Sequence, residues 1–147
     1  MINLQNLGVT LRTPLFANLD LVIGAGDRLG LVAANGTGKS TLLRCIAGDF
    51  EATSGEITRA RGVRVGHVPQ DVPAHLMGVT LQDAVREGLD ESDHWRADIV
   101  LDSLSTPAEL RDRRLDQLSG GWRRLALLAR TWVGDPDVLL LDEPTNH

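Results

Sequence analysis

The chain has 147 residues, 42% of them apolar, and a formal net charge of −5 at neutral pH. This size and apolar fraction predict one ordinary domain with one core. The acidic balance excludes a general electrostatic attraction to nucleic acid or to anionic membranes. The sequence has no apolar run long enough to span a membrane and no signal-peptide pattern, so we expect a cytoplasmic location.

The first third of the sequence predicts short strands at about residues 2–10, 19–23 and 28–33. The third run, RLGLVA, is almost continuously apolar, as expected for a strand buried on both faces. A glycine-rich turn then leads into KSTLLRCIA, residues 39–47, whose spacing predicts a helix that ends at Gly48. Strand, glycine-rich loop and helix in this order suit a phosphate-binding loop.

A phosphate-binding loop needs converging backbone amides, little side-chain bulk, a cation, and a hydroxyl for Mg²⁺. Lys39 is the only lysine among 15 basic residues, which favours a chemical role for its compact ammonium. The usual pattern G-x-x-x-x-G-K-[ST] fails at its first position, Ala33, where a methyl group fits if φ is negative. A solvated turn is the alternative for this motif alone. The nucleotide-binding residues that we predict are Asn35, Gly36, Thr37, Gly38, Lys39, Ser40 and Thr41.

The rest of the chain alternates predicted strands and helices. Residues 55–68 predict two more short strands, and residues 80–114 predict a small helical subdomain, because apolar positions recur three or four residues apart. A helix is expected over residues 121–133, with Ser119 as its N-cap. The run VLLLDE, residues 138–143, predicts another strand buried on both faces.

This last strand carries two acids, Asp142 and Glu143, to the carboxyl end of a sheet, where α/β folds bind ligands. Asp142 is there suited to hold Mg²⁺, and Glu143 to orient or deprotonate an attacking water. Upstream, LSGGW at residues 118–122 places a hydroxyl and two bare glycine backbones at a helix N-terminus. Such a terminus is either an anion site or simply a capped helix start.

Four motifs, ANGTGKST, VPQ, LSGG and LLLDEPT, together resemble the nucleotide-binding domain of the ATP-binding-cassette (ABC) superfamily over the whole chain. The resemblance implies an α/β fold: a P-loop NTPase (RecA-like) core, an N-terminal antiparallel β subdomain and a small helical subdomain. It implies a partial cassette over residues 1–147 whose C-terminal part is missing. The β subdomain and P-loop core would occupy about 1–70, the helical subdomain and signature helix 75–133, and the Walker B strand with the next loop 138–147.

The resemblance also implies Mg²⁺-dependent ATP hydrolysis, with ATP and Mg²⁺ as cofactors. The implied catalytic residues are Lys39 of the Walker A loop, Gln70 of the Q-loop and Glu143 as the base. Mg²⁺ would be held by Ser40 and Asp142 together with Gln70.

In the ABC superfamily two cassettes pack head to tail, and the signature of one closes over the γ-phosphate bound by the other. The residues in this role would be Ser119, Gly120 and Gly121. The partner would be a second cassette, either on the same chain or in a homodimer. Since one cassette holds half of each site, we expect the 147-residue chain to bind ATP weakly without turnover.

The sequence DEPTNH and the tryptophan of LSGGW resemble the F subfamily (ABC-F), whose members carry two cassettes on one chain and include ribosome-binding translation factors. A ribosome partner follows by analogy alone. Two alternatives stay open: the ATP-binding subunit of an ABC membrane transporter, which would dock a membrane partner, and a degenerate module that binds ATP without turnover.

Four further side chains have structural interpretations at this point. Phe16 is the aromatic residue nearest to the place where cassettes stack adenine, but we interpret it as a core residue. Cys45 is interpreted as a small buried residue of the helix after the loop. The pair Arg123 and Arg124 is interpreted as part of a solvated face or of intra-domain ion pairs.

Overall fold

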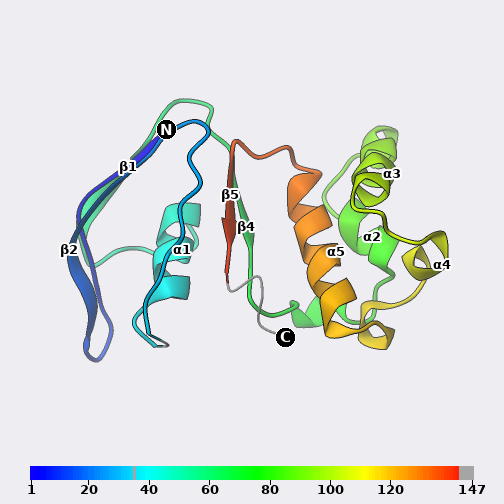
Figure 1. The fold of residues 1–147 in the computed structure, drawn as a ribbon, viewed down its shortest axis with the longest axis horizontal. Coiled ribbons are helices and arrows are strands. Elements are labelled where there is room, and N and C mark those ends of the chain that lie inside the picture. Colours follow the sequence, from blue (N-terminus) through cyan, green and yellow to red (C-terminus); the bar gives the residue numbers. More distant parts are fainter. Residues whose placement is uncertain (35, 143–147) are drawn as a thin grey trace.

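The computed structural model describes residues 1–34 and 36–142. Figure 1 shows three parts next to one another: an antiparallel sheet, a two-stranded parallel sheet with a helix between it and the first, and a group of helices. Among the described residues, no helix is both long and apolar enough to cross a membrane.

The antiparallel sheet has β1 (Ile2–Thr10) in the middle, between β2 (Pro14–Ile23) and β3 (Ser54–Arg59). The apolar residues of β1 occupy every second position, but this alternation shifts by one residue halfway along the strand. A register shift there, with Asn6 at φ 48°, returns the second half to the same face of the sheet. The side chains of β1 that are buried as a result are Ile2, Leu4, Leu7 and Val9.

The second sheet is a parallel pair, β4 (Val65–Val68) and β5 (Val138–Leu141), in which Val68 is opposite Leu141. Both strands therefore end at the same edge. Helix α1 (Lys39–Ala47) lies between the two sheets (Figure 1). Its buried side chains share one core with β1 and with Leu140 of β5. These residues of α1 are Leu42, Cys45 and Ile46.

The helical part follows β4, and its core also includes Val68 of that strand. Helix α5 lies between β4 and the other helices (Figure 1). Its apolar side chains, including Ala126 and Leu127, are buried against α2 and α3. The elements are the short 3-10 turns η1 (Ala74–Leu76), η2 (Glu91–Asp93) and η3 (Leu115–Gln117), and the helices α2 (Leu81–Arg86), α3 (His94–Ser103), α4 (Ala108–Arg111) and α5 (Gly120–Trp132).

Most predicted elements are present within one or two residues. The helix over 39–47 is confirmed, with Gly48 in a left-handed C-cap whose amide donates to the carbonyls of Arg44 and Cys45. Cys45 is buried, as interpreted, and burial raises the pKa of its thiol. Strand β2 begins at Pro14, earlier than predicted, because an edge strand tolerates proline at its first position.

The prediction of a doubly buried strand over 28–33 is wrong. Residues 28–34 are irregular and exposed, with Leu29 58% and Val32 95% exposed. A strand buried on both faces needs ladder partners at its edges, and among the described residues β4 and β5 pair only with each other. Strand β5 is likewise not doubly buried: Leu140 is buried, but Leu139 and Leu141 are 39% and 41% exposed.

Candidate nucleotide site

The phosphate-binding loop is organised around its own carbonyl groups. The ammonium Nζ of Lys39 donates to the carbonyl of Ala33 at 2.8 Å and to that of Ala34 at 3.2 Å. The Thr37 hydroxyl donates to the same Ala34 carbonyl at 2.7 Å. The structure thus brings Lys39 and Thr37 together over one short stretch of backbone. Asn35, also predicted for this site, lies outside the described residues.

Gly38 is required at the junction between the loop and α1. Its φ is +97°, a conformation that L residues rarely adopt. A Cβ at this position would lie 3.1 Å from Leu15 Cβ and 3.1 Å from Phe16 Cδ1. Strand β2 therefore packs directly on the end of the loop. Phe16 is half-buried against the core, as interpreted, and it also touches the loop.

The departure from the usual pattern at Ala33 has a simple explanation. The described non-glycine residues with positive φ do not include Ala33, so alanine fits its backbone angle. Its side chain is exposed, which leaves room for the methyl group. The first position of the pattern is therefore compatible with alanine in this chain.

The first turn of α1 presents an environment suited to an anion. Ser40 and Thr41 are half-buried there, and this turn contains no acidic residue. Arg44 lies in the last turn, at the other end of the helix. The positive end of the helix dipole and the backbone amides of this turn favour a negative group. Gly36 and Gly38, both with positive φ, precede the turn.

Gln70 and Asp142 are neighbours because β4 and β5 are parallel and end together. Asp142 follows Leu141 directly, and its amide donates to the Val68 carbonyl at 3.2 Å. Gln70 lies two residues beyond Val68 and is exposed, whereas Asp142 is only 5% exposed. Glu143, the predicted base, lies outside the described residues.

The residues present fit Mg²⁺ as a partner of bound phosphate. Among the described residues, no cluster of three His, Cys, Asp or Glu side chains could hold a metal by itself. Mg²⁺ commonly uses one or two carboxylates, waters and phosphate oxygens instead. The Asp142 carboxylate and the Ser40 hydroxyl have the oxygen chemistry that this mode requires.

The signature segment forms the start of α5. Ser119 is its N-cap, as predicted, and its hydroxyl accepts a long hydrogen bond of 3.5 Å from the Trp122 amide. Gly120 and Gly121 are exposed, and the first turn contains no acid. The N-termini of α5 and α1 both lie toward the lower edge of Figure 1, but on opposite sides of the β4–β5 pair. Within one chain, the signature therefore does not meet the phosphate-binding loop.

Sequence reasoning missed the role of the arginines after the signature. Arg123 donates to the carbonyls of Leu115 and Asp116, both at 2.8 Å. Arg124 donates to the carbonyls of Gln70 and Asp142. Both guanidinium groups thus donate hydrogen bonds to main-chain carbonyls. The doublet directly after LSGGW is the sequence signal, but sequence alone does not identify main-chain acceptors.

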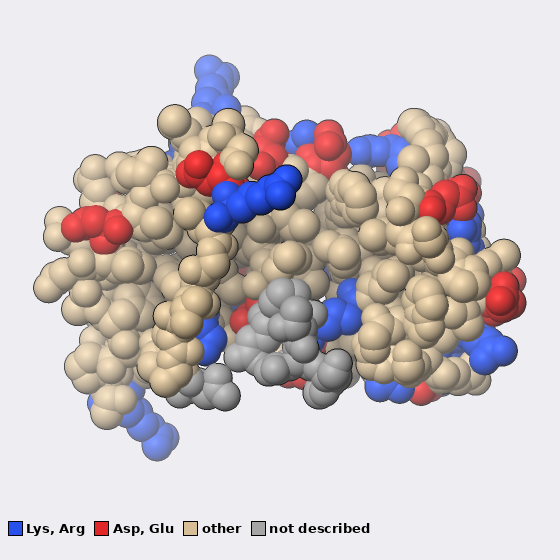
Figure 2. Space-filling view, in the orientation of Figure 1, with Lys and Arg blue, Asp and Glu red and all other residues tan. Residues whose placement is uncertain are grey.

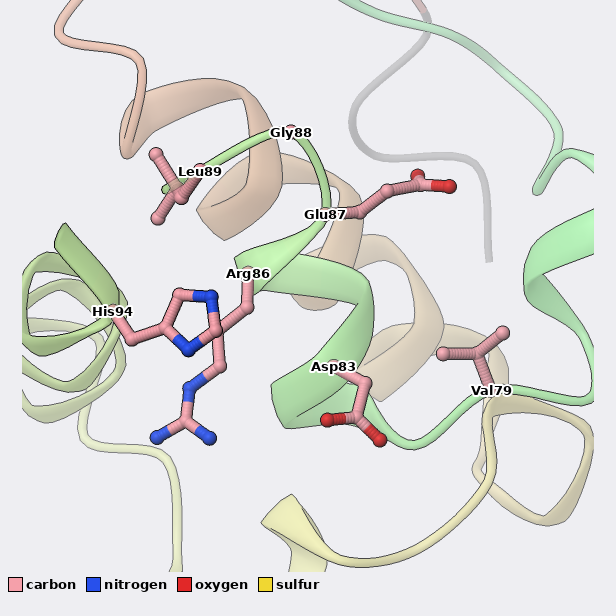
Figure 3. A pocket seen from close by; sticks show the side chains of 7 residues that line it. All are labelled: Val79, Asp83, Arg86, Glu87, Gly88, Leu89 and His94. Carbon is pink, nitrogen blue, oxygen red and sulfur yellow. The ribbon is translucent and has the colours of Figure 1, made fainter. Parts of the chain in front are cut away.

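A shallow pocket of about 370 Å³ lies in the helical part, apart from these motifs. Figure 3 shows its side chains coming from α2, from the segments on either side of α2 and from the start of α3. Two of its charges have partners outside it, since Arg86 bonds Asp98 and Glu87 pairs with Arg130. The residues that line the pocket are Val79, Asp83, Arg86, Glu87, Gly88, Leu89 and His94.

Comparison with known proteins identifies the class to which this fold and site belong. Residues 16–146 match the ABC transporter family, and the chain belongs to that family as a nucleotide-binding domain. Several relatives in this family are named as ATP-binding proteins.

Relatives come from two groups. The chain is 43% identical over 135 residues to the ATP-binding protein Uup of Caulobacter vibrioides, covering 91% of the chain and 21% of that protein. It is 37% identical over 133 residues to the zinc import ATP-binding protein ZnuC of Paracoccus denitrificans, covering 90% and 52%. It is 36% identical over 138 residues to ABC transporter F family member 4 of Arabidopsis thaliana, covering 89% and 19%. The chain spans about half or less of each relative.

Solved structures confirm the predicted fold class. A structure described as a metal-chelate type ABC transporter, inward-facing, matches with a TM-score of 0.83 and 31% identity, over 98% of this chain and 60% of that one. A dimeric ATP-binding cassette bound to ADP and Pi matches with a TM-score of 0.82 and 24% identity, over 99% and 75%, which supports the fold alone. The chain therefore has the P-loop NTPase fold of ABC cassettes.

Proposed function

We propose that this chain binds ATP with Mg²⁺ and, in the whole protein, hydrolyses ATP when two cassettes pair. One observation carries the proposal. The N-terminus of α1, which follows the lysine loop, lies at the same edge of the fold as the end of β5 and the start of α5, in a chain of the ABC transporter family. The three motifs supply a cation, a metal-binding carboxylate and a second anion-binding helix N-terminus.

Each residue has a definite task in this proposal. Lys39 exchanges its carbonyl bonds for phosphate oxygens, while the amides of Gly36 to Thr41 hold the phosphate chain. Ser40, Gln70 and Asp142 would hold Mg²⁺, which when bound would supply positive charge next to the phosphate oxygens. Gln70 and Glu143 orient the water, and Glu143 accepts its proton.

The second half of each site comes from the partner cassette. Ser119, Gly120 and Gly121 would reach the γ-phosphate held by the other loop, because the two motifs are separated within one chain. The chain of 147 residues is therefore proposed to bind ATP without multiple turnover by itself. Sustained hydrolysis by the purified chain would contradict this part of the proposal.

The role of Mg²⁺ is tested by replacing its proposed carboxylate. In the presence of EDTA, Asp142→Asn should bind ATP with the same affinity as the wild type. With Mg²⁺ present, the variant should lack most of the affinity that Mg²⁺ adds in the wild type. Calorimetric titration with ATP, with and without Mg²⁺, measures this difference. If Mg²⁺ raises the ATP affinity of the wild type and of the variant equally, Asp142 does not bind the metal.

We place the whole protein among the ABC-F type ATPases, with the ribosome as the partner by analogy. The support is the LSGGW sequence and the 43% identity to Uup. Figure 2 shows acidic and basic side chains scattered over one face, so a ribosome contact would need other surfaces or other residues. Cosedimentation of the Glu143→Gln protein with ribosomes in the presence of ATP tests this assignment.

A transporter subunit is the second candidate, because the chain covers 52% of a ZnuC protein at 37% identity. In that case the whole protein would be recovered with a membrane partner and would not sediment with ribosomes. The third candidate, a degenerate module, requires ATP binding without any turnover by the whole protein.

A further inference from the structure

Arg124 connects three motifs that the proposed function uses. It lies on α5, five residues after Ser119, or about 7 Å along the helix axis. One terminal nitrogen donates to the Gln70 carbonyl at 2.9 Å, and the other donates to the Asp142 carbonyl. The signature helix is therefore tied to the backbone at the ends of β4 and β5.

The geometry of the guanidinium explains why arginine is needed. Its two terminal nitrogens are held apart in one plane, so a single side chain can bond two carbonyls from neighbouring strands. Gln70 and Asp142 offer such a pair, because Val68 and Leu141 are opposite each other in the parallel ladder. The acceptors are main-chain atoms, so the contact depends on where the backbone of Gln70 and Asp142 lies.

The other arginines of α5 do not make this connection. Arg123 bonds the carbonyls of Leu115 and Asp116 in the turn before the signature. Arg130 pairs with the Glu87 carboxylate of the α2 C-terminus at 2.6 Å. Among these three, Arg124 alone bonds backbone from both β4 and β5 ends.

We propose that Arg124 is a positioning residue that couples the nucleotide site of its own cassette to the signature it offers to the partner cassette. This inference rests on the proposed function, in which Gln70 and Asp142 act on the nucleotide bound by the same chain and Ser119 acts on the other one. A shift of the backbone at Gln70 or Asp142 then moves α5, and with it the signature.

The coupling predicts a particular kinetic result in the whole protein. Arg124→Ala should keep most of its affinity for Mg-ATP, because the two carbonyls that Arg124 bonds belong to the main chain of Gln70 and Asp142 and are not the proposed ligands of Mg²⁺. It should lower kcat by about tenfold or more, because two hydrogen bonds of a charged donor are lost and one such bond corresponds to about tenfold. Arg124→Lys should recover part of kcat, because one ammonium can satisfy one of the two carbonyls. Arg130→Ala is the matched control, with the same charge change on the same helix, and should leave kcat unchanged.

A second measurement makes the inference independent of hydrolysis. Hydrogen exchange of the amides in residues 68–72, 138–142 and 119–124 should become faster together in Arg124→Ala and stay unchanged in Arg130→Ala. Equal exchange in both variants, or a kcat for Arg124→Ala equal to that of Arg130→Ala, would overturn the role of Arg124. If the wild type fails to hydrolyse ATP, the proposed function fails, while the exchange result still decides whether Arg124 ties these segments together.

Discussion

The ammonium of Lys39 lies 2.8 Å from the carbonyl oxygen of Ala33 and donates to it. The chain's only lysine thus bonds the residue at which its loop departs from the usual pattern. A phosphate oxygen is a stronger acceptor for an ammonium than a carbonyl, because that hydrogen bond is charge-assisted on both sides. In the proposed function, Lys39 therefore changes partners when nucleotide binds.

Replacing Lys39 by arginine should weaken ATP binding although the charge is kept. The planar guanidinium is larger than the ammonium and cannot reproduce its compact contact in a narrow loop. We expect a loss of about tenfold or more in affinity, the size of one charged hydrogen bond. Calorimetric titration with Mg-ATP measures it. Arg61→Lys, an exchange at an exposed loop position, is the control and should bind normally.

Replacing Ala33 by glycine should leave ATP affinity unchanged. The backbone angle at this position already suits alanine, so restoring the usual glycine provides no new conformation. The unfolded state gains freedom, which should cost about 0.5–1 kcal/mol of stability. Nucleotide titration and urea unfolding check both statements. A clear gain in affinity would show that the methyl group obstructs the site.

Replacing Gly38 by alanine should destabilise the loop junction. The alanine would have to keep the backbone angle φ +97°. Its Cβ would lie 3.1 Å from Leu15 Cβ and 3.1 Å from Phe16 Cδ1. The left-handed angle and the overpacking together should cost about 3 kcal/mol. Gly62→Ala, where φ is +82° with no atom within 4 Å of the new Cβ, should cost about 1 kcal/mol in urea unfolding. Equal losses would mean that β2 does not press on the loop.

The pair of Glu87 and Arg130 should make stability depend on acidic pH. The hydrogen bond from Arg130, aided by its charge and by His75, holds the pKa of Glu87 below its ordinary value of 4.5. The folded-state pKa is the lower one, so the stabilisation is complete above pH 4.5 and is lost as the pH falls through the folded-state pKa.

Because Glu87 is 43% exposed, its contribution should stay below about 1 kcal/mol. Glu87→Gln should therefore be slightly less stable than the wild type at pH 7, and this difference should be smaller at pH 3. Urea unfolding at the two pH values tests this, and Arg130→Gln should add no further loss to Glu87→Gln. A constant difference between wild type and variant across pH would contradict the ion pair.

Local patterns in the sequence were sufficient to predict the helix after the loop and the cap of α5. The start of α1 follows from glycines and a lysine next to a periodic apolar run, and the Ser119 cap follows from a hydroxyl before two glycines. These features depend on neighbours within one turn of the chain. The same holds for the short strands β3 and β4.

The failures arise where structure depends on distant partners. The run over 28–33 has the composition of a buried strand, but composition does not supply the ladder partners that a strand needs. The role of Arg124 was missed for a related reason, because its acceptors are backbone atoms 54 and 18 residues away in the sequence. Neither relationship can be read from local periodicity.

The most direct measurement of the central claim is steady-state Mg-ATP hydrolysis by the whole protein and by its Glu143→Gln variant. With Glu143 as the base, the variant should bind ATP as tightly as the wild type and lose about a hundredfold or more in kcat. A wild type that neither binds nor hydrolyses Mg-ATP, or a variant that hydrolyses it at the wild-type rate, would contradict the proposed ATPase mechanism.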